Sequence, residues 1–462
     1  IGGSVSGLTG TLVLQDNGAD NLSVTANGSF TFATPLASGA LYSVTVATQP
    51  AGQVCAVSDG AGSVAGPVST VVVVSCTSST SSGRWTWMSG SNMVDAAGQY
   101  GSEGSAAAGN VPGAREATGS WTDSAGNLWL FGGFGYDVND NAGMLNDLWK
   151  YSPSGGQWTW EGGAQSVGAT GIYGTQGVPA AADIPGAREG AATWTDAAGD
   201  LWLFGGVGAD ANQNSVEFND LWKYDPNSAQ WTWVSGSSVP GATGSYGTQA
   251  VAAVSNEPSA RANAVSWIDS AGVLWLFGGA QYSAWSVSAV FNDLWSYNPG
   301  TAQWTWVSGS SVPNAAGVYG SAGVAASGNA PGARVGATGW LDASGNLWLM
   351  GGYGVDQNQS AGELNDLWQY NPSSGEWTWI SGASTQAVRR LYGTQGIGAA
   401  GNAPGARVTA VSWTDVSRNS WLFSGFGYDQ QGTLAALDDR LDLGNLGLQV
   451  MEDHFDTFFI KW

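Results

Sequence analysis

The chain has 462 residues, of which only 10% are charged, and its 35 acidic residues against 13 basic ones give a net charge of −22. This charge argues against nucleic acid and anionic membranes as partners, because both attract clustered lysine and arginine. No apolar run approaches the roughly 20 residues of a membrane helix. The glycine-rich, weakly charged composition favours an all-β protein outside the cell. Because the chain starts with Ile1 rather than Met, we expect that a leader has been removed.

Residues 1–77 contain short runs with alternating or β-branched residues, at 10–15, 22–26, 29–33, 42–47 and 70–75. Asn-Gly pairs at 17–18 and 27–28 are typical of tight hairpin turns. These features predict a β-sandwich, and the segment resembles the immunoglobulin-like or prealbumin-like domains of bacterial surface proteins. A polar linker is expected at 78–83.

The two cysteines, Cys55 and Cys76, both lie near the ends of strand-like runs in this first domain. We interpret them as a disulfide, which implies an oxidising compartment and an extracellular or bacterial cell-surface location. The alternative is a pair of free buried thiols.

From Arg84 onward the sequence repeats every 73 residues without an insertion or deletion. Each of five copies contains Pro-x-Ala-Arg, and four contain paired glycines followed by Asn-Asp-Leu-Trp. Trp-Thr-Trp begins at 85, 158, 231, 304 and 377. In the second copy, strands are expected at 190–195, 201–205, 220–224 and 230–234.

Four short antiparallel strands per repeat are typical of a propeller blade. The strand that ends in Gly-Gly, with Tyr and Trp downstream, resembles the Kelch family, although Kelch repeats are usually near 50 residues long. The surplus here is an insertion of about 25 residues between Trp-Thr-Trp and the next Pro-x-Ala-Arg. The fold class is therefore expected to be an all-β, five-bladed Kelch-like β-propeller over 84–445, after an N-terminal β-sandwich.

The phase of the repeat predicts how the ring closes. The first Trp-Thr-Trp, at 85–87, has no blade before it, and the last blade has Val450 where its own copy should begin. Pairing 85–87 with the last blade would leave no open sheet edge. A longer parent chain with more blades is the alternative. The tail at 446–462 matches no repeat, and we expect an edge strand there or a docking segment.

Enzyme chemistry is disfavoured. The resemblance extends distantly to the central domain of galactose oxidase, which implies a copper site with two histidines, but this chain has a single histidine, His454. A single histidine also argues against His-containing catalytic triads and His-rich zinc sites. Acidic residues recur in every blade, which fits a structural role better than one active site.

One arginine recurs in each blade, before the first strand. A ring of these residues would suit an anion, whereas the alternative pairs each with the aspartate of Asn-Asp-Leu-Trp. The set comprises Arg115, Arg188, Arg261, Arg334 and Arg407.

Oxygen-rich loops between the second and third strands suggest calcium, because hard cations bind clustered oxygens. Turns of this composition also satisfy their own backbone, which is the alternative. The residues are Asp137, Asn139, Asn141, Asp210, Asn212, Asn214, Asp356 and Asn358.

The third repeat replaces that loop with Ala280–Trp285, in which Tyr282 and Trp285 are aromatic contact candidates. We therefore expect a non-enzymatic, extracytoplasmic adhesion or binding module that recognises a glycan or a protein, with no transmembrane segment. The alternative is a self-assembling subunit of an extracellular filament or surface layer.

Overall fold

The computed structural model describes residues 1–50, 53–66, 70–78, 87–209, 215–393, 401–415 and 419–442, all in strands, turns and loops. They fall into two units, Ile1–Trp87 and Met88 onward. The expected linker therefore lies largely outside the described residues. So do the tail and most of the closing segment, of which only Trp87 is described. Ring closure stays a prediction.

The first unit contains two four-stranded sheets, with strand orders β4-β1-β8-β6 and β3-β2-β5-β7. Neighbours pair antiparallel except β1 and β8, which run parallel. The strands are β1 (Gly2–Ser6), β2 (Leu12–Asp16), β3 (Asp20–Val24), β4 (Gly28–Thr31), β5 (Leu41–Thr48), β6 (Gln53–Ser58), β7 (Ala61–Ser63) and β8 (Thr70–Ser78).

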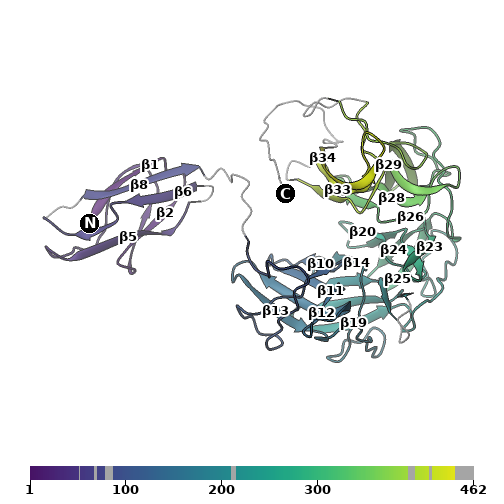
Figure 1. Ribbon diagram of the computed structural model, residues 1–462, viewed down its shortest axis with the longest axis horizontal. Helices are drawn as coiled ribbons and strands as arrows, with labels where there is room; N and C mark the ends of the chain where they lie inside the picture. Colours follow the sequence, from purple (N-terminus) through teal and green to yellow (C-terminus); the bar gives the residue numbers. More distant parts are fainter. Residues whose placement is uncertain are drawn as a thin grey trace. The chain divides into compact units, whose positions relative to one another are not determined.

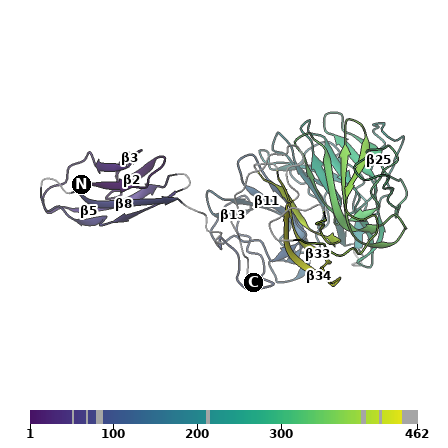
Figure 2. The same ribbon diagram turned by 90° about the horizontal axis from the view of Figure 1, so that it is seen from above.

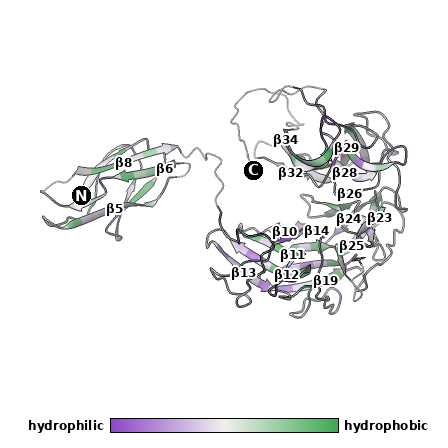
Figure 3. Ribbon diagram, viewed as in Figure 1, coloured by the Kyte–Doolittle hydropathy of each residue, from purple (hydrophilic) through white to green (hydrophobic). Residues whose placement is uncertain are grey.

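One apolar core lies between these sheets, and it includes Leu12, Leu14, Val74 and both cysteines. Alternation along the strands creates it, because successive side chains of a strand face opposite sides of the sheet. Figure 3 shows the resulting mixture of hydrophobic and hydrophilic residues along β5, β6 and β8.

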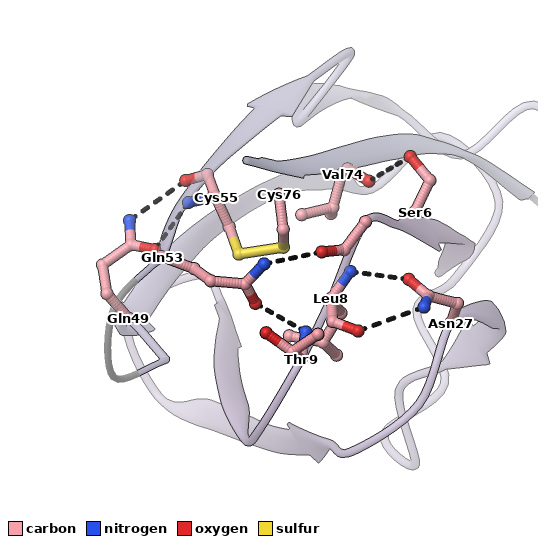
Figure 4. Close-up of a disulfide and its surroundings, with 10 residues drawn as sticks. Ser6, Leu8, Thr9, Asn27, Gln49, Gln53, Cys55, Val74 and Cys76 are labelled. Atoms are coloured by element: carbon pink, nitrogen blue, oxygen red, sulfur yellow. Dashed lines mark hydrogen bonds between the residues drawn. A yellow bond between two sulfur atoms is a disulfide. The ribbon is translucent and has the colours of Figure 1, made fainter. Parts of the chain in front are cut away.

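A disulfide joins Cys55 on β6 to Cys76 on β8, as predicted, and the two residues are directly paired in the sheet. Amide side chains bond to the backbone around it (Figure 4): Gln53 bonds Gly7 O and Thr9 N, and Asn27 bonds both backbone groups of Leu8. These side-chain hydrogen bonds connect β6 and the residue before β4 to the segment between β1 and β2.

Each 73-residue repeat of the second unit forms one sheet of four or five strands, and blades 2 and 3 each add a separate two-stranded sheet, β16-β17 and β22-β23. In the first four blades, the strand order runs from the inside of the propeller outwards, and Figure 1 shows β10, β14 and β20 near its centre with β13, β19 and β25 at its periphery. Blade 1 has β9 (Arg115–Glu116), β10 (Gly119–Thr122), β11 (Leu128–Tyr136), β12 (Ala142–Ser152) and β13 (Gln157–Gly162). Blade 2 has β14 (Ala192–Thr195), β15 (Leu201–Phe204), β16 (Val207–Ala209), β17 (Ser215–Glu217), β18 (Leu221–Asp225) and β19 (Gln230–Ser235).

The remaining blades follow the same plan. Blade 3 has β20 (Val265–Ile268), β21 (Leu274–Phe277), β22 (Ala280–Ser283), β23 (Ser286–Val290), β24 (Leu294–Asn298) and β25 (Gln303–Ser308). Blade 4 has β26 (Arg334–Val335), β27 (Thr338–Leu341), β28 (Leu347–Val355), β29 (Ala361–Asn371) and β30 (Glu376–Ser381). Blade 5 has β31 (Arg407–Val408), β32 (Val411–Thr414), β33 (Ser420–Tyr428) and β34 (Leu434–Asp442), and Figures 1 and 2 both show β33 beside β34, with which it pairs.

Apolar cores form between neighbouring blades. One cluster combines Trp121 and Trp129 of blade 1 with Leu201 and Leu203 of blade 2, and the next two clusters continue the pattern into blades 3 and 4. Each blade is therefore stabilised by its neighbours, as expected for a repeat too small to bury its own faces.

A chain of backbone hydrogen bonds joins consecutive blades. The N–H of Gly190 donates to Ala117 O of the preceding blade. The same bond joins each later blade to the one before it, from Asn263 to Gly190, from Gly336 to Asn263 and from Thr409 to Gly336. All five residues have a positive φ, which explains glycine at two of them. The paired glycines add a second contact, because Gly133 N–H donates to Arg188 O of the next blade. A Cβ on Gly132 would lie 2.6 Å from that same oxygen.

The beginning of the second unit repeats a contact made elsewhere between blades. Ser89 Oγ accepts from Trp158 Nε1, as Ser235 does from Trp304 and Ser308 from Trp377. Ser235 and Ser308 end the outer strands β19 and β25. Ser89 thus occupies the position of an outer-strand end relative to blade 1.

The disulfide gives a prediction for the first unit. Replacing Cys55 and Cys76 with alanine should lower its free energy of unfolding by about 2–4 kcal/mol, because the bridge restricts the unfolded chain. Calorimetry of the whole protein should show one transition moving down while the propeller transition stays in place. A shift of both transitions by the same amount would contradict this assignment.

Candidate functional site

Each blade contains a buried arginine–aspartate pair. In blade 4, Arg334 Nη1 and Nη2 lie 2.6 and 2.7 Å from the two carboxylate oxygens of Asp366. Across the blades the arginine side chains are at most 5% exposed, and the partners are Asp147, Asp220, Asp293, Asp366 and Asp439. This arrangement matches the pairing alternative rather than an accessible anion-binding ring at Arg115, Arg188, Arg261, Arg334 and Arg407.

The tyrosine of each insertion reaches this pair. Tyr319 Oη donates to Asp366 at 2.7 Å, and Trp368 Nε1 donates to the same carboxylate oxygen at 2.7 Å. Burial raises the pKa of Tyr319, and the negative charge of Asp366 raises it further. Burial alone would also raise the pKa of Asp366, but the charge and hydrogen bonds of Arg334, with those of Tyr319 and Trp368, outweigh burial and lower it. The carboxylate is thus ionised and fully bonded.

The insertions cover the outer edges of the blades. In blade 1, Gly104 N–H donates to Trp160 O and Ala107 N–H to Trp158 O, and both acceptors belong to the outer strand β13. The side chain of Asn110 donates to Trp158 O as well. The same contacts recur in blades 2–4, apart from the asparagine side chain in blade 2. The insertions are thus edge covers, a role that the sequence did not indicate.

The oxygen-rich loops form self-satisfied turns where the structure describes them. Asp137 Oδ1 accepts from the N–H groups of Asn139 and Asn141, and Asp356 Oδ1 accepts from those of Asn358 and Ser360. Among the described residues, no group of three or more His, Cys, Asp and Glu could hold a metal ion. Asp210, Asn212 and Asn214 lie outside the described residues. The two described turns therefore have the hydrogen bonds that the alternative expects, and calcium binding stays a prediction.

The blade-3 hairpin, β22–β23, separates the two aromatic candidates. Tyr282 is half-buried, accepts a hydrogen bond from Asn263 Nδ2 at 2.8 Å, and donates its N–H to Glu217 Oε1 at 2.8 Å. It therefore anchors the hairpin to the blade-2 hairpin. Trp285 is 47% exposed and lies in the two-residue turn between Ser283 and Ser286.

The backbone at this turn is strained for its residues. Ala284 and Trp285 have φ values of 49° and 63°, in the left-handed region that a two-residue hairpin turn of type I′ requires. Asn-Gly is the favoured pair there, and a bulky residue with positive φ is an outlier. Strain of this kind costs about 1–3 kcal/mol per residue and concentrates at functional sites.

A cavity of about 600 Å³ lies against the inner strands of blades 1–3. Hydroxyl groups and indole rings alternate along its wall, which includes Ser120, Trp121, Thr122, Thr193, Trp194, Thr195, Ser266 and Trp267. Two of these hydroxyls bridge neighbouring blades, because Thr193 donates to Ser120 O and Ser266 donates to Thr193 O, each at 3.2 Å. The cavity lining is uncharged and mostly apolar, with hydroxyl groups among indole rings.

Sequence reasoning missed Glu217 and Asn263, which hold the hairpin. Asn263 differs from all its counterparts in the other repeats, which are Ala117, Gly190, Gly336 and Thr409. A residue-by-residue comparison of the repeats would have identified Asn263 but not Glu217, because blade 4 also has a glutamate, Glu363, at that position.

A family model described as the KLHDC2/KLHL20/DRC7 Kelch-repeats domain matches residues 175–390. No curated protein matches the chain. One solved structure, "Structure of YjhT", is 14% identical, with a TM-score of 0.45 over 73% of this chain and 84% of that chain. Among the described residues, no helix has the length and apolar character of a membrane-spanning segment.

The buried pair gives a prediction. Replacing Asp366 with Asn should destabilise the propeller by about 3–5 kcal/mol at neutral pH, because Arg334 keeps its charge without a partner. The ionised carboxylate stabilises the fold above its unfolded pKa of about 3.9, and this contribution is lost as the pH falls through the lowered pKa of the folded state. Urea unfolding should show the difference from wild type shrinking towards acid.

Tyr319→Phe is the matched control, because it removes one hydrogen bond and leaves both charges, at a cost of about 1 kcal/mol. A loss for Asp366→Asn no larger than this would show that the charge pair is not what stabilises the blade.

Proposed function

Because the second unit is a Kelch-type β-propeller, we propose that the protein is a non-enzymatic binding module that recognises a partner protein outside the cell through the blade-3 hairpin. Kelch propellers are protein-binding folds. The disulfide between Cys55 and Cys76 supports a location outside the cytoplasm, since such bridges persist in oxidising compartments. Adhesion at the cell surface is the role that fits both units.

Trp285 is the observation that carries the proposal. It is a large, half-exposed aromatic side chain at a hairpin tip, and tryptophan is enriched among the residues that dominate protein–protein binding energy. None of the other four repeats has an aromatic residue at this position, where they have Asn139, Asn212, Asn358 and Gln431. The position is therefore specific to one blade and is not required by the propeller.

The strain at the turn strengthens this argument. A sequence selected for stability alone would place Asn-Gly at 284–285, whereas Ala-Trp adopts the same backbone at a cost. Tyr282 and Glu217 hold the hairpin while the indole stays in solvent. An anchored hairpin presents Trp285 with little entropy to lose on binding.

The double variant Ala284→Asn/Trp285→Gly separates folding from binding. It should raise the propeller's melting temperature by relieving the strained turn, and it should abolish binding by removing the indole. A photo-reactive amino acid at Val287, exposed on the same hairpin, should cross-link wild-type protein to a surface protein of the source cells. Unlabelled wild type should compete for this product, and the double variant should not.

A photo-reactive group at Asn358, on the corresponding loop of blade 4, is the matched control and should give no competed product. If the double variant competes as well as wild type, the hairpin is not the binding surface. Loss of stability in the variant would contradict the strain argument separately.

Glycan binding in the blade 1–3 cavity is a second candidate, favoured by its wall of hydroxyl groups and indole edges. Its hydroxyl groups can hydrogen-bond a sugar, whereas the indoles of Trp121, Trp194 and Trp267 are at most 5% exposed and present only edges. Replacing the exposed Thr122 with Phe should fill part of the cavity, remove binding on a glycan panel, and leave hairpin-dependent cross-linking intact. Glycan binding that survives this change would exclude the cavity.

A further inference from the structure

One buried acidic residue in the edge cover of blade 2 has an oxygen without a hydrogen-bond partner. Asp183 is 5% exposed, and its Oδ2 atom bonds to nothing. The other four repeats have asparagine at this position: Asn110, Asn256, Asn329 and Asn402. Only blade 2 therefore has a carboxyl group here, with an oxygen in place of the amide nitrogen of asparagine.

The asparagines show what this position requires. In blade 3, Asn256 Nδ2 donates to Val251 O at 2.9 Å and to Trp304 O at 3.1 Å. In blade 4, Asn329 Nδ2 donates to Val324 O at 2.9 Å and to Trp377 O at 3.1 Å. The position thus contains a donor between two carbonyl oxygens, one in the insertion and one in the outer strand.

The backbone around Asp183 is the same as around the asparagines. Asp183 N–H donates to Ala180 O at 3.1 Å, and Ala180 N–H donates to Trp231 O at 3.4 Å. Blade 1 has these contacts at identical distances, from Asn110 to Ala107 and from Ala107 to Trp158. In this register the counterparts of the two carbonyls are Val178 O and Trp231 O. An ionised carboxylate would face both with no proton between them.

Few other groups act on Asp183. The N–H of Gly174 donates to the carboxyl, and this bond lowers its pKa less than burial raises it. Insertion residues 164–187 contain no other charged residue, and the outer strand β19 contains none. Arg188 and Asp220, the charged pair of this blade, are bonded to each other, and Tyr173 donates to Asp220.

We propose that Asp183 is a proton switch on the edge of blade 2. As the neutral acid it donates its O–H to one of the two carbonyls and holds the insertion on β19. Once ionised, it repels both carbonyls and loosens the insertion, which exposes the β19 edge. The acid can replace only one of the two bonds that asparagine makes, so this cover is the weakest of the four described on outer strands.

The direction of the pH dependence follows. A carboxyl whose pKa is raised by folding binds its proton more tightly in the folded protein, so its ionisation opposes folding. The penalty is absent below the unfolded pKa of about 3.9, grows as the pH rises through the folded pKa, and is complete above it. Stability therefore falls towards neutral pH because of this one group.

The test uses the full chain and two reciprocal variants. Asparagine makes one hydrogen bond more than the neutral acid, so Asp183→Asn should melt slightly higher than wild type near pH 4, and the difference should widen to a few degrees at pH 8. Asn256→Asp should transfer the same pH dependence to blade 3. Hydrogen exchange, corrected for intrinsic rates, should show the amides of Gly177 and Ala180 losing protection with pH in wild type, while Ala250 and Ala253 of blade 3 do not.

Three results would overturn the proposal. The first is a melting difference between Asp183→Asn and wild type that does not change with pH. The second is unchanged protection of Gly177 and Ala180 from pH 4 to pH 8. The third is a rise in the wild-type melting temperature at pH 8 on addition of calcium chloride or sodium chloride that Asp183→Asn lacks, because the carboxylate would then hold a cation instead of a proton.

Discussion

The buried arginine–aspartate pair is the interaction on which each blade depends. The guanidinium of Arg188 donates to Gly186 O, to Gly205 O and to both carboxylate oxygens of Asp220. The pair therefore connects the segment before the inner strand to the glycine pair and to the third strand. A buried ion pair is stable only if its remaining donors and acceptors are also bonded, and here tyrosine and tryptophan complete the set. The Pro-x-Ala-Arg, Gly-Gly and Asn-Asp-Leu-Trp motifs and the tyrosine of the insertion thus each supply one part of a single polar cluster.

This cluster explains how a long insertion fits into a small repeat. The tyrosine of the insertion donates a hydrogen bond to the aspartate, which ties the insertion to the interior of the blade. The rest of the loop then lies against the outer strand and bonds to its carbonyls at two residues. An outer strand without such a cover would present unpaired backbone groups to other chains. The insertion thus pairs with backbone groups of the outer strand that would otherwise be open to other chains.

Much of this arrangement could be predicted from sequence, because repetition reports what every blade needs. The strands expected at 201–205 and 230–234 correspond to β15 and β19, and the disulfide between Cys55 and Cys76 is present. The first unit was less predictable. Strand β1 has two glycines among its five residues, and β7 is Ala-Gly-Ser, so neither has the β-branched alternation that marks a strand. Its immunoglobulin-like or prealbumin-like character stays a prediction.

Contacts that occur at only one of the five repeats could not be predicted, because they depend on residues that are far apart in the sequence. Tyr282 and Trp285 are equivalent aromatic candidates in the sequence, yet Tyr282 is half-buried and hydrogen-bonded to Glu217 and Asn263, whereas Trp285 is 47% exposed. The same reasoning applies to Asp183, whose sequence neighbours resemble those of the asparagines. The consequence of having an acid there depends on two carbonyl oxygens, and in the corresponding contact of blade 3 one of them belongs to a residue 48 positions away in the sequence. Comparing the repeats therefore separates residues that every blade needs from residues found in one blade. The role of a residue found in one blade depends on its neighbours in space, which the sequence does not show.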